Sequence, residues 1–70
     1  MNKSTLLKKL SQASRGNFFT IELPVESREE AETIENAASE LEREGKIKIR
    51  ECEVKETFIY IQGIMKYAVT

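Results

Sequence analysis

Residues 27–45 read SREEAETIENAASELEREG, and this stretch predicts a helix over Arg28–Glu44. Ser27 followed by Glu30 is a capping-box pattern, which satisfies free backbone N–H groups at the start of a helix. Apolar residues recur at helical spacing, at Ala31, Ile34, Ala37, Ala38 and Leu41. Gly45 stands where a left-handed residue ends many helices. The predicted helix therefore has one apolar side of mostly small residues, which can lie close against a sheet.

The chain before this helix predicts a shorter helix and a strand. Ser4–Ser14 carries one apolar stripe at helical spacing, with Ser4 as its expected N-cap. Gly16 is expected to end this helix in a left-handed conformation. In Phe18–Leu23 apolar and polar residues alternate, which predicts a strand that Pro24 closes.

The chain after the long helix predicts a β-hairpin from Lys46 to Phe58 and onward to Ile64. Apolar residues alternate along its first strand, but their parity changes near Arg50, which indicates a bulge or the end of the strand. The returning strand is apolar on both faces over 58–61. It is therefore either central in the sheet or a strand whose second face meets another protein. No pattern assigns a structure to Met65–Thr70.

These elements predict one small domain over residues 1–70, of class α+β and order α-β-α-β-β. Two helices are expected to pack on a small antiparallel sheet. Phe18 and Phe19 are adjacent in a strand, so they point to opposite faces of that sheet. Either the helices cover both faces, or a homodimer or a partner protein covers the second one.

The composition offers no apparatus for enzyme chemistry, a metal or a cofactor. The chain has no histidine, and Cys52 is its only cysteine. Glu51 and Glu53 flank this thiol and should raise its pKa rather than activate it. No apolar run approaches the about 20 residues that a membrane span needs. The sequence therefore predicts a non-enzymatic, cytoplasmic protein with no small-molecule substrate.

The net charge of −1 conceals a separation of charge along the chain. Residues 26–44 carry eight glutamates against two arginines, and basic residues gather on either side. The candidate nucleic-acid contacts are Lys8, Gln12, Arg15, Lys46, Lys48, Arg50 and Lys55. If these two basic sets adjoin, they form a patch that can contact phosphates. Otherwise each set is only the solvent-exposed face of an amphipathic helix or strand. Phe58 and Tyr60 are the candidate protein interface.

The run 38–47, ASELEREGKI, ends a predicted helix with an inward leucine and a glycine. A strand, a loop and a returning strand that ends at Gly63 follow it. In this order Ala37–Ile64 resembles the back half of a winged-helix domain, and the first helix and strand fit the opening of that family. The resemblance implies DNA binding in a bacterial or phage regulator. Glutamates line the helix that would read bases, so Lys46–Lys55 is the expected DNA contact.

Two functions therefore stay open at the level of sequence. One is a small regulatory or accessory protein that contacts DNA through its basic hairpin and first helix. The other is a protein-interaction module, which forms a homodimer or caps a partner with its spare strand face or its acidic helix. A third, a nucleic-acid mimic built on the glutamates, is disfavoured by the basic segments that flank them.

Overall fold

The computed structural model describes residues 1–66 and confirms the α+β class and the predicted order of elements. These elements are α1 (Lys3–Ala13), β1 (Phe18–Pro24), α2 (Arg28–Arg43), β2 (Ile47–Val54) and β3 (Phe58–Met65). The strands form one antiparallel sheet in the order β1-β3-β2, so β3 is the central strand. Met65 thus belongs to β3, whereas residues 67–70 of the unassigned tail lie outside the described residues.

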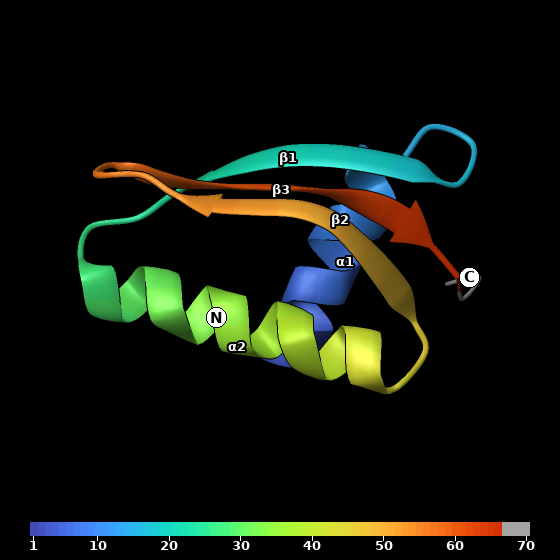
Figure 1. The fold of residues 1–70 in the computed structure, drawn as a ribbon, viewed down its shortest axis with the longest axis horizontal. Helices are drawn as coiled ribbons and strands as arrows, with labels where there is room; N and C mark the ends of the chain where they lie inside the picture. The colour runs from blue at the N-terminus through green and yellow to red at the C-terminus, as the bar shows by residue number, and fades with distance from the viewer. Residues whose placement is uncertain (67–70) are drawn as a thin grey trace.

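Both helices lie on the same face of the sheet (Figure 1). α1 packs against β1, α2 packs against β2, and the two helices contact each other. Burial alternates along β3 accordingly: Ile59, Ile61 and Met65 are buried, whereas Phe58 and Tyr60 are half-buried. The alternative in which helices cover both faces of the sheet is therefore wrong.

The core lies between the helices and the covered face of the sheet. All five residues of the predicted apolar stripe of α2 are buried. Leu6 and Leu10 of α1 and Phe19 and Leu23 of β1 join them. The alanines of α2 permit a close approach of the helix, because a small side chain fills little of the space between two layers.

α2 begins and ends by the local signals that its sequence carries. The Ser27 hydroxyl accepts a hydrogen bond from the Glu30 N–H at 3.1 Å, and the Glu30 carboxylate accepts one from the Glu26 N–H at 3.3 Å. At the other end Gly45 has φ +78°. Its N–H and that of the next residue donate to carbonyls of the last turn, each at 3.0 Å, which is a Schellman motif.

Both predictions for the ends of α1 are wrong. Asn2 is the N-cap, since its side chain accepts a hydrogen bond from the Thr5 N–H at 2.8 Å, and Ser4 lies inside the helix. Asparagine caps a helix as well as serine does, and here it stands earlier in the chain. Gly16 is left-handed at φ +63°, but it serves the tight turn Arg15–Phe18 rather than the end of α1.

β2 contains a bulge where the parity of its apolar residues changes. Arg50 is an extra residue between two successive pairs of β2 and β3, Ile49–Gly63 and Glu51–Gln62. The strand does not end there but continues to residue 54. The bulge keeps the apolar residues on both sides of it facing the helices.

The face of the sheet turned away from the helices is called the open face. It carries Phe18, Thr20, Glu22 and Pro24 of β1, Phe58, Tyr60, Gln62 and Ile64 of β3, and Lys48, Glu51 and Glu53 of β2. Within residues 1–66 no helix or strand covers it (Figure 1).

Candidate interaction surfaces

The basic residues of the first segment lie on the β1 side of the molecule. Lys8 and Gln12 are exposed on α1, which packs against β1. Arg15 lies outside the helix, in the turn that begins β1. β1 and β2 are the opposite edges of the sheet, with β3 between them. The structure therefore does not place Arg15 beside the basic residues of β2.

Two of the four basic residues of the hairpin are engaged in ion pairs. The Lys46 ammonium lies 3.3 Å from the Glu44 carboxylate, and the Lys55 ammonium lies 2.8 Å from the Glu53 carboxylate. The hydrogen bond from Lys55 lowers the pKa of Glu53 and raises that of Lys55 itself. These four side chains are between one third and one half exposed, and each pair offsets part of the positive charge that the sequence places on the hairpin.

Lys48 and Arg50 are the hairpin cations that form no ion pair within residues 1–66. Both are exposed: Lys48 lies opposite Ile64 on the open face, and Arg50 forms the bulge. Within residues 1–66 the hairpin therefore offers a phosphate only the unpaired charges of Lys48 and Arg50, and the carboxylates of Glu51 and Glu53 follow on the same strand and face.

Lys3, which the sequence did not single out, ties the start of α1 to the end of α2. Its ammonium contacts the carboxylate of Glu44 and lies 3.7 Å from that of Glu40. The hydrogen bond from Lys3 lowers the pKa of Glu44, and Lys46 adds to this effect. Part of the acidic surface of α2 is therefore neutralised by the chain itself.

The open face is a mixed surface with apolar residues at both ends. Phe18 pairs with Ile64 at one end and is 58% exposed, the most of any large apolar side chain in residues 1–66. Pro24 pairs with Phe58 at the other end, next to Tyr60. The structure thus places the two candidate interface residues, Phe58 and Tyr60, together on the open face.

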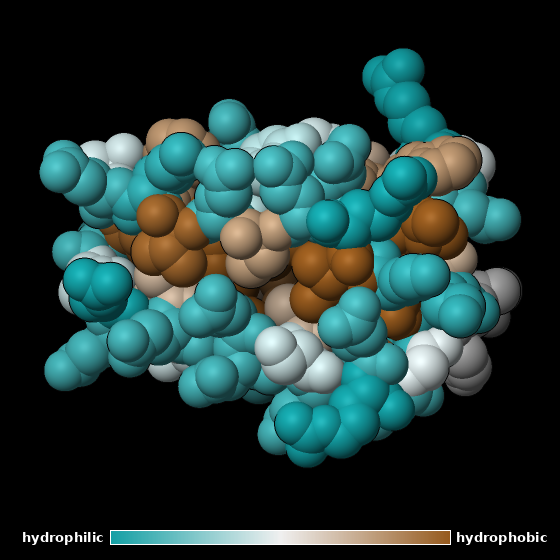
Figure 2. Space-filling view, viewed as in Figure 1, coloured by the Kyte–Doolittle hydropathy of each residue, from teal (hydrophilic) through white to brown (hydrophobic). Residues whose placement is uncertain are grey.

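A second apolar surface follows the seam between α2 and β2. Figure 2 shows a band of hydrophobic side chains there, bordered by hydrophilic ones above and below. β2 turns half-buried Ile49 and Cys52 toward this seam, together with Val54, which is 40% exposed. This surface was not predicted from the sequence; the parity change near Arg50 is the signal that could have indicated it, because a bulge there turns Ile49 and Cys52 to the same side of the sheet.

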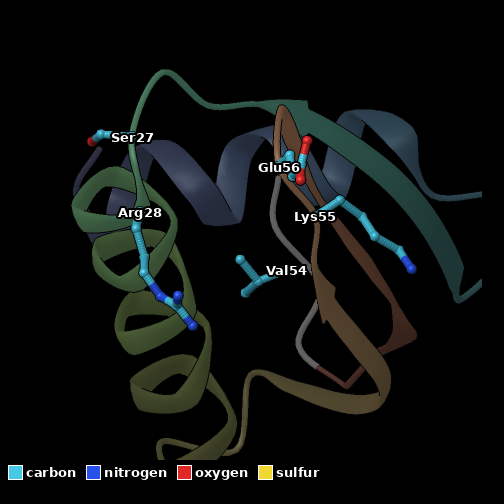
Figure 3. Close-up of a pocket in the computed structure, with 5 residues that line it drawn as sticks. All are labelled: Ser27, Arg28, Val54, Lys55 and Glu56. Atoms are coloured by element: carbon cyan, nitrogen blue, oxygen red, sulfur yellow. The ribbon is translucent and has the colours of Figure 1, made fainter.

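A hollow of ≈ 210 Å³ opens at the end of the seam, between the first turn of α2 and the β2–β3 turn. It is lined by Ser27, Arg28, Val54, Lys55 and Glu56. Val54 points into the gap between helix and hairpin, whereas the Lys55 side chain points away from it (Figure 3). Val54 is the one apolar residue among those that line this hollow.

Residues 1–66 contain few side chains suited to nucleophilic catalysis or metal binding. Burial raises the pKa of the Cys52 thiol, and the charge of Glu35 raises it further, so this cysteine is a poor nucleophile. Residues 1–66 contain no group of three or more acidic, cysteine or histidine side chains placed to hold a metal ion. Neither α1 nor α2 has the length and hydropathy that a membrane crossing requires.

Comparisons with models of protein families, with curated proteins and with solved structures find no match to this chain.

Proposed function

We propose that this protein is a non-enzymatic interaction module that binds a partner protein on the open face of its sheet. The observation that carries the proposal is the open face itself, on which Phe18 is 58% exposed and three other large apolar residues are half-buried: Ile64 beside Phe18, and Phe58 and Tyr60 toward the other end. Full burial of an exposed side chain of this size is favourable by about 1.5–3 kcal/mol, and burial of a half-buried one by a correspondingly smaller amount. Burial of these side chains by a partner therefore contributes favourably to the free energy of binding.

The charges of the open face indicate the chemistry of the partner. Glu22, Glu51 and Glu53 outnumber Lys48 and the Lys55 that pairs with Glu53, so the face carries a small net negative charge. Its apolar residues stand at both ends, with Thr20, Gln62 and Glu51 between them. The partner surface that complements it has one apolar region at each end and, between them, a centre that is basic or rich in hydrogen-bond donors.

The same geometry favours a protein partner over DNA. DNA binding needs several cations that face the phosphates together. Here Lys46 and Lys55 are paired with glutamates, and Arg15 lies at the far edge of the sheet from β2. The DNA-binding hypothesis and the winged-helix resemblance stay predictions.

Tyr60→Lys is expected to weaken partner binding at least tenfold without unfolding the domain. Tyr60 lies between Glu22 and Glu53 on the open face, so a lysine has carboxylates on both sides in the free protein. In a complex the same ammonium would lose its water beneath an apolar contact, at a large cost. Ser39→Lys, on the exposed side of α2, is the matched control. Pull-downs with the wild type and both variants identify the partner, and titration of the purified partner into each of the three proteins gives Kd. Equal affinity for all three proteins contradicts the proposal.

Duplex DNA is expected to leave the amide signals of Lys48 and Arg50 unmoved at about 0.1 M salt, where exposed charges more than about 10 Å apart are largely screened. Titration of the labelled protein with a generic duplex, at this salt and at a tenth of it, tests the alternative. Shifts that cluster at these two residues and in α1, and that fade as salt rises, would favour the DNA-binding hypothesis instead.

A further inference from the structure

β1 is an edge strand whose backbone turns hydrogen-bonding groups away from the sheet. The Met65 N–H donates to the Asn17 carbonyl at 2.6 Å at one end, and the Val25 N–H donates to the Thr57 carbonyl at 2.9 Å at the other. Odd-numbered residues of this stretch therefore bond to β3, because hydrogen-bonded and non-bonded pairs alternate in antiparallel strands. The even-numbered residues turn their N–H and C=O groups to the free edge; they are Phe18, Thr20, Glu22 and Pro24.

Only Thr20 and Glu22 have both of these backbone groups available. Phe18 already exchanges hydrogen bonds with Arg15, at 3.1 and 2.7 Å, and Pro24 has no N–H. The side chains of Thr20 and Glu22 are exposed, and within residues 1–66 β1 pairs along its length with β3 alone. This edge is thus open to one further strand over a short, defined length.

The other edge of the sheet is protected against such pairing. β2 is interrupted by the bulge at Arg50, and the Glu42 carboxylate accepts a hydrogen bond from the Ile49 N–H at 2.8 Å. Charged side chains and bulges are the devices by which proteins keep edge strands from pairing. Over 18–23, β1 has neither a bulge nor a proline, and Glu22 is its one charge.

We infer that the free edge of β1 pairs antiparallel with β1 of a second copy of this chain, with Thr20 of each copy opposite Glu22 of the other. In this register both Thr20–Glu22 pairs are hydrogen-bonded pairs, and each exchanges two backbone hydrogen bonds. A shift in one direction places the two Glu22 carboxylates opposite each other, where like charges repel. A shift in the other direction needs backbone groups of Phe18 that Arg15 already occupies.

The same register covers the most exposed apolar side chain of the described chain. Phe18 of one copy lies on the open face opposite Pro24 of the other, whose neighbour on β3 is Phe58. On the helix-facing side the two copies of Ile21, half-buried in the monomer, meet at the two-fold axis. Apolar clusters at opposite ends of the two open faces thereby become continuous. The contact uses an edge of the sheet and leaves Tyr60 free, but it covers Phe18, on which the proposed function also draws; Tyr60→Lys therefore distinguishes the two proposals.

Two substitutions at one exposed residue test the pairing. Sedimentation equilibrium of the full chain, from about 10 μM to 1 mM, is expected to show a monomer–dimer equilibrium, in the range that small interfaces reach. Thr20→Glu places a carboxylate opposite Glu22 of the other copy and is expected to weaken the dimer at least tenfold. Thr20→Lys is expected to tighten it severalfold, and adding Glu22→Lys to Thr20→Glu is expected to restore it. Circular dichroism checks that each variant is folded.

A disulfide between copies tests the register. In a Cys52→Ser background, Ile21→Cys is expected to cross-link on mild oxidation, because a non-bonded pair brings its Cα atoms to about 4.5 Å. Thr20→Cys is the control, since its two copies lie more than about 7 Å apart in this register. Cross-linking of Thr20→Cys in preference to Ile21→Cys overturns the register. A monomer at every concentration, a dimer that neither charge change affects, or one that Tyr60→Lys dissociates overturns the proposal.

Discussion

Replacing Gly63 by alanine is expected to lower the free energy of unfolding by about 3 kcal/mol, the upper part of the range for overpacked cores. Gly63 is buried in β3 between Phe19 of β1 and Ile49 of β2. A Cβ atom there would collide with the Lys48 carbonyl oxygen and lie 2.7 Å from Cζ of Phe19. The ring can move slightly, but the carbonyl belongs to a paired strand and cannot. Urea unfolding followed by circular dichroism measures the loss.

Gly45→Ala is the matched control for this prediction. A Cβ atom at Gly45 would meet nothing within 4 Å, so the cost there comes only from the backbone, at φ +78°. That cost is about 1 kcal/mol, the penalty for a side chain in the left-handed region. An equal decrease in the free energy of unfolding for Gly63→Ala and Gly45→Ala would contradict the close packing of Phe19 and β2 against Gly63.

Ile61→Ala is expected to cost about 3 kcal/mol, whereas Ile64→Ala is expected to cost about 1 kcal/mol or less. The two residues have the same side chain and lie in the same central strand, but they face opposite sides of the sheet. Ile61 is completely buried beneath the helices, so its truncation leaves a cavity. Ile64 is half-buried on the open face, where water can fill the space that the truncation leaves.

Urea unfolding of both variants at low protein concentration measures this difference directly. A loss for Ile64→Ala as large as that for Ile61→Ala would contradict an open face that is bare in the monomer. Repeating the measurement at rising protein concentration then shows whether Ile64 is buried within the monomer or by a second copy of the chain. A cost that grows with concentration indicates that a second copy covers the face, because association stabilises the folded state by mass action.

The candidate surfaces were predicted only in part. The apolar run over 58–61 predicted a strand that is central or presents its second face to another protein; the structure makes β3 central and places the candidate interface residues Phe58 and Tyr60 together on its open face. The pairing of Lys46 and Lys55 with nearby glutamates was not predicted, because long side chains can reach several partners and the sequence does not select one. The separation of Arg15 from the basic residues of β2 was not predicted, because the spacing along one helix does not determine at which edge of the sheet that helix packs.

Elements whose signals are local could be predicted from the sequence alone. Ser27, Glu30 and Gly45 set the ends of α2, its small apolar residues set its buried side, and a change of parity marked the bulge at Arg50. Such signals act within one or two turns of helix or along one strand, so they can be found from spacing alone.

Three other features could not be predicted in this way: both helices lie on one face of the sheet, Phe18 is left exposed, and β1 has a free edge whereas Glu42 protects the edge of β2. These features depend on contacts between segments far apart in the chain. An amphipathic helix fits either face of a sheet that is apolar on both, so its own periodicity cannot select between them.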